Sequence, residues 1–328
     1  MQGHSILFRL LVALSLTMVS AASFGQAFPN RPIKVIVPYA AGGGTDTVIR
    51  PVATAVAAHL GQPVVIENRP GGNTFIGMSA CAKALADGYT LCVTNADVLA
   101  FGPYIFNRIP YNPQTDLTGI TKIAHSPNGI FVSTQMPFKT IQDLIAYAQA
   151  NPKKLNFATF GAGTVGHLYI EYFRRQMGAE MTHVPYRGAG PIIPALITNE
   201  VQVSYLSLAQ ALPHLKNGKI RILAVVDSER HAELPDVPTL AESKADAGIK
   251  AYFGLYAPTG TPTPVLQRLN AAFGAALNEQ SVQASMSGLM FVVQPSSIDE
   301  INQAREQEFT RAGELTRAIG LKPVDIPE

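Results

Sequence analysis

The chain has 328 residues, of which 47% are hydrophobic and 15% are charged, which is enough for one large or two medium-sized domains with proper cores. Arg9, an apolar run over residues 10–22 and the small residues up to Ala27 are typical of a secretory signal peptide, so we expect residues 1–27 to be removed from an exported protein. Their removal takes away one arginine and no acid, and the formal charge falls from +2 to +1 (24 basic and 23 acidic residues). This near-neutral balance argues against binding to nucleic acid or to anionic membranes. No later run approaches the roughly 20 apolar residues of a membrane-spanning helix, so we expect no membrane insertion.

The apolar pattern after the leader predicts a first α/β series. Runs of β-branched residues bounded by glycine turns indicate strands, and amphipathic stretches between them indicate helices. The expected strands are residues 35–37, 63–67 and 90–94, and the expected helices are residues 45–60 and 74–86. Strands that alternate with helices form a parallel sheet with helices on its faces. Residues 101–128 are rich in Pro, Asn and Tyr, and we expect a long irregular connection there.

A second α/β series follows, in which Thr140 and Asp143 form a capping-box-like pair at the start of a helix. The expected strands are residues 130–133, 155–160, 181–184, 201–205 and 220–226, and the other expected helices are residues 165–176 and 191–197. The remaining elements are too few for a third domain and are strands near 252–257 and 290–293 and helices near 264–278 and 299–318. We therefore expect two lobes, each a mainly parallel sheet flanked by helices. Lobe 1 comprises residues 28–128 and 249–328, and lobe 2 comprises residues 129–248.

The sequence contains two cysteines, Cys81 and Cys92. An exported protein meets an oxidising environment, which permits a disulfide. However, Cys81 falls in an expected helix and Cys92 in an expected strand, where both could be buried free thiols. Both possibilities stay open, and we favour the free thiols. Two cysteines at this spacing make no zinc site, and no His-Glu-x-x-His motif occurs.

A glycine-rich turn follows the first expected strand. Gly42, Gly43 and Gly44 let the backbone turn sharply and leave its N–H groups uncovered, and Thr45 and Asp46 are good caps for the next helix. The N-terminus of a helix presents unpaired N–H groups and a partial positive charge, which suits an anion. We interpret the turn as a seat for a carboxylate, although it could simply connect strand and helix. A phosphate loop would need Gly-Lys-Ser/Thr at its end, which this turn lacks.

The segment from Gly161 to Gly166 is a literal G-x-G-x-x-G between an expected strand and an expected helix. A dinucleotide site would also need an acid at the end of the next strand, and Glu180 stands before that strand instead. We therefore expect a second helix N-terminus with exposed amides, to which Thr164 adds a hydroxyl. His167, one turn into the helix, could donate a hydrogen bond to an anion or could pack between the lobes.

Other side chains could share the same crevice. Asn95 and Asp97 follow the third expected strand, and ligands of α/β sheets bind at the carboxyl ends of strands, so this segment and the first glycine turn could face one another. Tyr39 either walls the crevice or packs in the core, and Arg187 either pairs with a carboxylate or is solvated. No Gly-x-Ser-x-Gly elbow and no recognisable spacing of nucleophile and base occurs, which favours a receptor over an enzyme.

Seven short motifs occur in an order that resembles one known family. The motifs of the first half are Pro29-Asn30-Arg31-Pro32-Ile33 leading into Val37-Pro38-Tyr39-Ala40-Ala41-Gly42-Gly43-x-x-Asp46, then Val65-Ile66-Glu67-Asn68-Arg69-Pro70-Gly71-Gly72 and Asp87-Gly88-Tyr89-Thr90-Leu91. Those of the second half are Gly161-x-Gly163-Thr164-x-x-His167-Leu168, Val184-Pro185-Tyr186-Arg187-Gly188, Leu234-Pro235-Asp236-Val237-Pro238-Thr239 and Ala257-Pro258-x-Gly260-Thr261-Pro262. Together they make essentially the whole mature chain similar to the solute-binding receptors of tripartite tricarboxylate transporters, the Bug family.

The resemblance implies a periplasmic receptor with a two-lobed, type II-like fold and two crossover segments at the hinge. Such a receptor encloses a small organic carboxylate and delivers it to the membrane subunits of its transporter, and we expect a monomer without enzymatic activity or cofactor. In this family, amides of the first glycine loop and ordered water hold the ligand carboxylate. By that analogy, the ligand-binding residues are Tyr39, Ala41, Gly42, Gly43 and Asp46 of lobe 1, Asn95 at the crevice floor, and Thr159, Gly163, Thr164 and His167 of lobe 2.

Several alternatives remain at this stage. Asp46 could cap the helix and order water instead of touching the ligand, and Arg187 replaces the lysine that is usual in the family. The identity of the acid is open, with a lean towards a mono- or dicarboxylate because few charged residues fall in the expected site. An exported hydrolase-like enzyme that uses the same cleft, or a ligand sensor for a membrane kinase, is the rival function.

Overall fold

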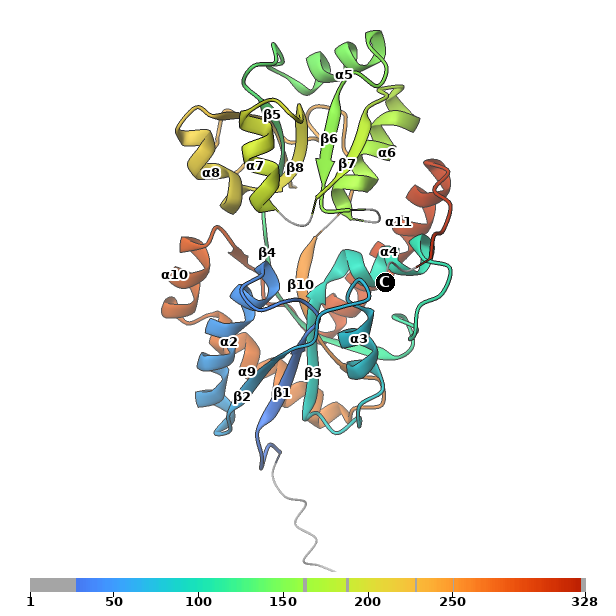
Figure 1. The fold of residues 1–328 in the computed structure, drawn as a ribbon. Helices are drawn as coiled ribbons and strands as arrows, with labels where there is room; N and C mark the ends of the chain where they lie inside the picture. Colours follow the sequence, from blue (N-terminus) through green and yellow to red (C-terminus); the bar gives the residue numbers. More distant parts are fainter. Residues whose placement is uncertain (1–27, 162–163, 187–188, 228, 250, 326–328) are drawn as a thin grey trace, which may run out of the picture.

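The computed structural model describes residues 28–161, 164–186, 189–227, 229–249 and 251–325. These residues form two lobes, each built on its own β-sheet, with the chain passing between the lobes twice (Figure 1). The first sheet has the order β11 (Val292–Val293), β4 (Leu117–His125), β10 (Tyr252–Pro258), β3 (Thr90–Asn95), β1 (Ile33–Val37) and β2 (Val64–Asn68). The second sheet has the order β7 (Thr182–Pro185), β6 (Asn156–Thr159), β8 (Val203–Ser207), β5 (Asn128–Ser133) and β9 (Ile220–Val226).

Helices cover both sheets. Those around the first sheet are α2 (Gly44–Leu60), α3 (Phe75–Ala82), α4 (Ala96–Ile105), α9 (Thr263–Leu277), α10 (Gln280–Gly288) and α11 (Ile298–Ala318). Those around the second sheet are α5 (Ile141–Ala150), α6 (Val165–Met177), α7 (Ala189–Ile197) and α8 (Leu208–Lys216). Strand β1 shows how the first sheet is buried on both faces: Val35 and Val37 pack with α2 and α9, whereas Ile36 packs with α3 and α4. Among the described residues, no helix combines the length and the apolar character needed to cross a membrane.

Both sheets are mixed, which corrects the expectation of mainly parallel sheets. Strand β1 pairs in parallel with β2 and β3, but β10 runs antiparallel to both of its neighbours, β3 and β4. In the second sheet β6 is parallel to β7 and β8, whereas β5 is antiparallel to β8 and β9. The physical reason is the double crossing: the chain leaves the first sheet along β4 and returns along β10, and adjacent outgoing and returning strands must run in opposite directions.

Residues 101–128 do not form a long irregular connection, and this prediction was wrong. Helix α4 extends to Ile105 despite Pro103 in its last turn, and β4 occupies residues 117–125. Strand β4 is hidden in the sequence because it is buried almost throughout instead of alternating, and even Thr121 is fully buried. Strand β4 pairs on both edges, with β10 and with β11, so tertiary pairing outweighs its polar composition. Helices α8 and α10 were also missed, whereas the capping box of Thr140 and Asp143 is confirmed.

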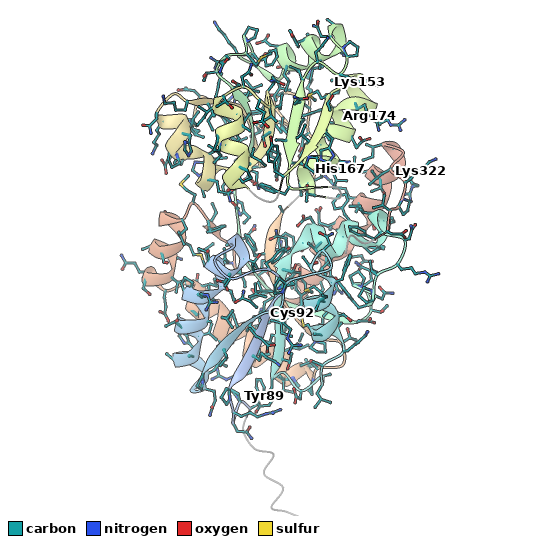
Figure 2. The ribbon with its side chains drawn as sticks, in the orientation of Figure 1. Tyr89, Cys92, Lys153, His167, Arg174 and Lys322 are labelled. Atoms are coloured by element: carbon teal, nitrogen blue, oxygen red, sulfur yellow. A yellow bond between two sulfur atoms is a disulfide. The ribbon has the colours of Figure 1, made fainter. Side chains whose placement is uncertain are left out.

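A disulfide joins Cys81 at the end of α3 to Cys92 in β3, so the preference for free thiols was wrong (Figure 2 labels Cys92). Helix α3 packs on β3, and this packing brings the two Cα atoms to 6.0 Å, within the range that a disulfide spans. Both cysteines are fully buried. Their separation of 11 residues in the sequence carried no information about this approach.

Replacing Gly274 by alanine is expected to stabilise the protein by about 0.5–1 kcal/mol. Gly274 lies inside α9, where a Cβ atom would meet nothing within 4 Å, and alanine loses less backbone entropy on folding than glycine. The matched control is Gly77→Ala in α3, where the added Cβ atom would lie 2.7 Å from the carbonyl oxygen of Arg69. This variant is expected to be less stable than wild type because of the clash. Urea unfolding of the three proteins measures both effects, and a loss of stability in the Gly274 variant would contradict the first.

Candidate functional site

A cavity of about 420 Å³ lies between the lobes at the carboxyl ends of β1 and β3. Both lobes line it, which is the position expected for a ligand of two α/β lobes. Its aromatic lining residues are Tyr39, Phe75, Phe101, Phe106, Phe160, Tyr205, Phe253 and Phe291. Its polar lining residues are Asn73, Thr74, Asn95, Asp97, Ser126, Asn128, Thr164, Ser207 and Gln210. The described lining therefore includes one acidic side chain and no lysine, arginine or histidine.

Five helices begin at this cavity. The residues at their N-terminal ends that line it are Gly44 of α2, Thr74 of α3, Asn95 of α4, Thr164 of α6 and Ser207 of α8. In none of these five helices does the N-cap side chain accept a hydrogen bond from the first turn, although in α4 backbone N–H groups of Asp97 and Val98 donate to the carboxylate of Asp97. The first N–H groups of a helix have no partner within the helix, so these termini bring donors and partial positive charge to one cavity.

Two helices that begin away from the cavity contrast with these five. Helices α5 and α11 both have complete capping boxes, formed by Thr140 with Asp143 and by Ser297 with Glu300. Helices α9 and α10 also begin away from the cavity and have no N-cap hydrogen bond from a side chain, so the lack of a cap is not confined to the cavity. At the cavity, the N–H groups of Phe75, Ile76 and Leu208 already donate to loop carbonyls. The other N–H groups at these helix ends suit an anion.

Asp46 stabilises the first glycine turn and does not cap helix α2. The carboxylate of Asp46 accepts hydrogen bonds from the backbone N–H of Gly42 at 2.8 Å, from Arg50 Nε at 2.8 Å and from Asn68 Nδ2 at 2.9 Å. The hydrogen bonds from Arg50 are the main reason why the pKa of Asp46 is lowered to about 2. The N–H of Gly43 also has a partner, the carbonyl of Ala40 at 3.3 Å.

The expectation that Thr45 and Asp46 cap the following helix was therefore wrong. Helix α2 begins at Gly44 with Gly43 as its N-cap, because the buried Asp46 carboxylate is turned towards the loop and towards Arg50. Ala41, Gly42, Gly43 and Asp46 are not among the residues that line the cavity, whereas Gly44 is. Sequence reasoning named the glycine run but omitted Gly44 from the site, and only the folded turn shows which glycine faces the cavity.

In the second lobe Thr164 lines the cavity, and its hydroxyl donates to the carbonyl of Gly161 at 2.8 Å. Thr159 and His167 are not among the lining residues. Thr159 Oγ1 lies 2.6 Å from His183 Nε2, and the ring of His167 lies 4.7 Å from that of His183. Burial lowers the pKa of His167, which favours the neutral ring. His167 lies at the lower edge of the second lobe in Figure 2. Its contact with His183 of β7 is made within that lobe, so it bears out neither the hydrogen bond to an anion nor packing between the lobes.

Two residues singled out in the sequence, Gly163 and Arg187, lie outside the described residues. Tyr39 and Asn95 both line the cavity, Tyr39 after β1 and Asn95 as the N-cap of α4. Burial raises the pKa of Tyr39 above its usual range, so its phenol is neutral. Of the residues predicted for the site, the cavity thus brings together Tyr39, Asn95 and Thr164.

Asp97, in the first turn of α4, also lines the cavity. Its Oδ1 atom is buried and has no hydrogen-bond partner among the described residues. Burial raises the pKa of the carboxyl group to about 6, although backbone N–H groups of Asp97 and Val98 oppose the rise. The sequence placed Asp97 at the end of a strand, but nothing in it indicated that one carboxylate oxygen is left unpaired.

Asp97 is expected to make the ligand-free protein less stable as the pH rises from about 4 to 6. The ordinary pKa is 3.8 and the folded value is about 6, so in this window the unfolded chain has lost a proton that the folded protein keeps, and unfolding becomes easier. The free energy of unfolding above pH 6 is therefore expected to be lower by about 2 kcal/mol than near pH 4. This value allows for solvent screening, because Asp97 keeps some exposure to solvent. Thermal unfolding of wild type and Asp97→Asn should show equal stability near pH 4 and a more stable variant at pH 7. A difference in stability between the two proteins that does not change with pH would show that the ionisation of Asp97 is not its cause.

Among the described residues, no group of three or more His, Cys, Asp and Glu side chains is placed to hold a metal ion. The site described so far therefore consists of helix N-termini, amide and hydroxyl side chains, aromatic walls and one carboxylate. Such a set of groups can hold and orient a small anion.

Comparison with known proteins agrees with this description. A family described as the tripartite tricarboxylate transporter family receptor matches residues 48–321. Protein BugT of Bordetella pertussis is 31% identical over 306 residues, which cover 93% of this chain and 94% of BugT. The R. palustris protein Rpa4515, solved with adipate, superposes with a TM-score of 0.79 at 32% identity, covering 90% of this chain and 100% of Rpa4515.

The periplasmic binding protein BugD superposes with a TM-score of 0.77 at 28% identity, over 90% of this chain and 100% of BugD. This likeness confirms the predicted two-lobed fold of a periplasmic binding protein. The family match covers most of the chain, as the seven sequence motifs did. The chain belongs to the tripartite tricarboxylate transporter receptor family, whose members are periplasmic solute-binding receptors.

Proposed function

We propose that this protein captures a small organic carboxylate in the cavity between its lobes and delivers it to the membrane subunits of a tripartite tricarboxylate-type transporter. The observation that carries the proposal is the convergence on one cavity of five helix N-termini whose N-cap side chains accept no hydrogen bond from the first turn. A carboxylate can accept several backbone N–H groups at once, and such bonds to a charged acceptor are stronger than bonds between neutral groups. The structure of Rpa4515 with adipate supports an organic acid as the ligand.

Five residues are proposed to contact the ligand. They are Tyr39, Gly44, Asn95, Thr164 and Ser207, which line the cavity from both lobes. The role proposed for Asp46 is indirect, because its carboxylate holds the glycine turn through the N–H of Gly42. This arrangement lets Gly44 face the cavity while the neighbouring amides are used within the turn.

Ligand capture is proposed to close the two lobes about the segments that join them. The chain crosses between the sheets at residues 126–127 and again between residues 226 and 252, close to the expected lobe boundaries at residues 128/129 and 248/249. His125 Nε2 and Asp227 Oδ2, one at each crossing, lie 3.1 Å apart and tie the two segments together. Contacts that the ligand makes with both lobes favour the closed form, which the membrane subunits would then recognise.

Binding without turnover is part of the proposal. The described lining offers serine and threonine hydroxyl groups at Thr74, Ser126, Thr164 and Ser207 but no histidine or lysine that could act as their base. We further propose that residues 1–27 direct export and are removed, and that the mature protein acts as a monomer in the periplasm.

The test is a thermal-shift screen of residues 28–328 against mono-, di- and tricarboxylates, amino acids and aromatic acids. A ligand that binds only the folded protein adds about 2.7 kcal/mol of stability at a hundredfold excess over Kd. A clear rise of the unfolding midpoint with at least one acid, recovered unchanged by mass spectrometry, is the expected result. No shift with any acid would contradict the carboxylate site, and conversion of a bound acid into product would favour an enzyme.

A further inference from the structure

The cavity contains one feature that capture of a simple carboxylate leaves unused, the carboxylate of Asp97. Within the part of the chain that the structure describes, its Oδ1 atom is buried without a hydrogen-bond partner. A buried acceptor left unpaired usually costs more than a hydrogen bond contributes. Among the described residues ten buried side-chain atoms are in this state, and Oδ1 of Asp97 is the only carboxylate oxygen among them. No lysine, arginine or histidine is present among the described lining residues to pair with it.

Asp97 stands at the polar end of an otherwise apolar surface of α4. Asp97, Phe101 and Ile105 are spaced by four residues, lie on one side of the helix and all line the cavity. Phe75 and Phe106 add to this apolar wall. The neighbouring ionisable groups are phenols: the charge of Asp97 contributes to raising the pKa values of Tyr39, Tyr205 and Tyr256, which burial already keeps neutral.

The cavity thus offers two opposite partners to one ligand. Helix N-termini provide donors for a carboxylate, and Asp97 provides a lone acceptor with a negative charge. A second carboxylate beside Asp97 would meet repulsion that no described cation in the lining offsets. A protonated amine would instead supply both the missing hydrogen bond and the opposite charge.

We propose that the ligand is an amino acid or another ammonium-bearing organic acid with an apolar body, and that Asp97 selects it by binding the ammonium group. This rests on the proposed function, because the helix N-termini must first hold the carboxylate. The apolar body lies against Phe101 and Ile105. Asp97 is a specificity residue in this scheme, and the carboxylate seat works without it.

The test uses acids that share six carbon atoms and differ in one group: hexanoate, adipate, 6-aminohexanoate and 2-aminohexanoate. Calorimetric titration at pH 7.5 should show at least one of the two amino acids binding about tenfold or more tighter than hexanoate and adipate. Asp97→Asn should remove this preference without weakening the binding of hexanoate, because the variant loses a negative charge and no group that holds the carboxylate. Asp236→Asn, the same substitution at an exposed position, is the matched control and should keep the wild-type pattern.

The outcomes separate this inference from the proposed function. Equal or tighter binding of hexanoate or adipate in the wild type, or an Asp97→Asn variant that retains the preference for an amine, would overturn the role of Asp97 and leave the carboxylate receptor standing. If none of the four acids bound while another acid of the wider screen did, the inference would also be overturned. If no acid of any class bound, the proposed function itself would fail. The ligand-free melting midpoint of the Asp97→Asn variant, expected to be above that of wild type at pH 7.5, shows that the variant is folded.

Discussion

Replacing Gly44 by valine is expected to weaken carboxylate binding about 100-fold while leaving the fold intact. Gly44 begins α2 and lines the cavity, and a Cβ atom there would lie 4.0 Å from the ring of Phe253, which is an ordinary contact. The branched side chain would occupy the cavity and cover the free N–H groups of the helix end. Loss of a hydrogen bond to a charged acceptor costs about 1.5–3 kcal/mol, and the upper value corresponds to roughly 100-fold in affinity.

The measurement is calorimetric titration of the acid that the thermal-shift screen identifies, with wild type and variant side by side. Gly288→Val is the matched control, because Gly288 ends α10 on the surface and a Cβ atom there meets nothing within 4 Å. It should bind the acid as wild type does. Unchanged affinity in the Gly44 variant would show that the N-terminus of α2 does not contact the ligand.

Removing the disulfide is expected to cost about 3 kcal/mol of stability. Cys81 and Cys92 are separated by 11 residues, and the chain-entropy relation for a loop of this length gives a stabilisation of about that size. For a chain of about 300 residues the unfolding midpoint of the double variant Cys81→Ala/Cys92→Ala should fall by roughly 5 °C. Thermal unfolding followed by circular dichroism measures the change.

Reduction provides the control for this prediction. A thiol reductant should lower the midpoint of the wild type by a similar amount and should not affect the double variant. Equal midpoints of oxidised and reduced wild type would contradict a stabilising role for the bridge. Because the bridge fixes α3 to β3 beneath the cavity, the same experiment measures how firmly one wall of the site is held.

Local signals in the sequence were sufficient for most elements of the fold. The β-branched run of β1, the glycine that ends α2 at residue 61 and the capping box of α5 each depend on neighbouring residues, and each was found where the sequence indicated. The seven motifs also identified the family, because a receptor of this class carries its motifs along the whole chain. Elements that owe their state to distant partners, such as β4 between β10 and β11, were missed for that reason.

The sequence by itself determined the two α/β series, the glycine turns at helix N-termini and the absence of a recognisable catalytic pattern, because these follow from local propensity and periodicity. Tertiary structure alone decided which of these groups meet. It turned Asp46 into the loop so that Gly44 faces the cavity, placed His167 against His183, joined Cys81 to Cys92 and left Asp97 with an unpaired oxygen. Each of these outcomes depends on contacts between elements far apart in the chain, and side-chain spacing in the sequence does not encode them.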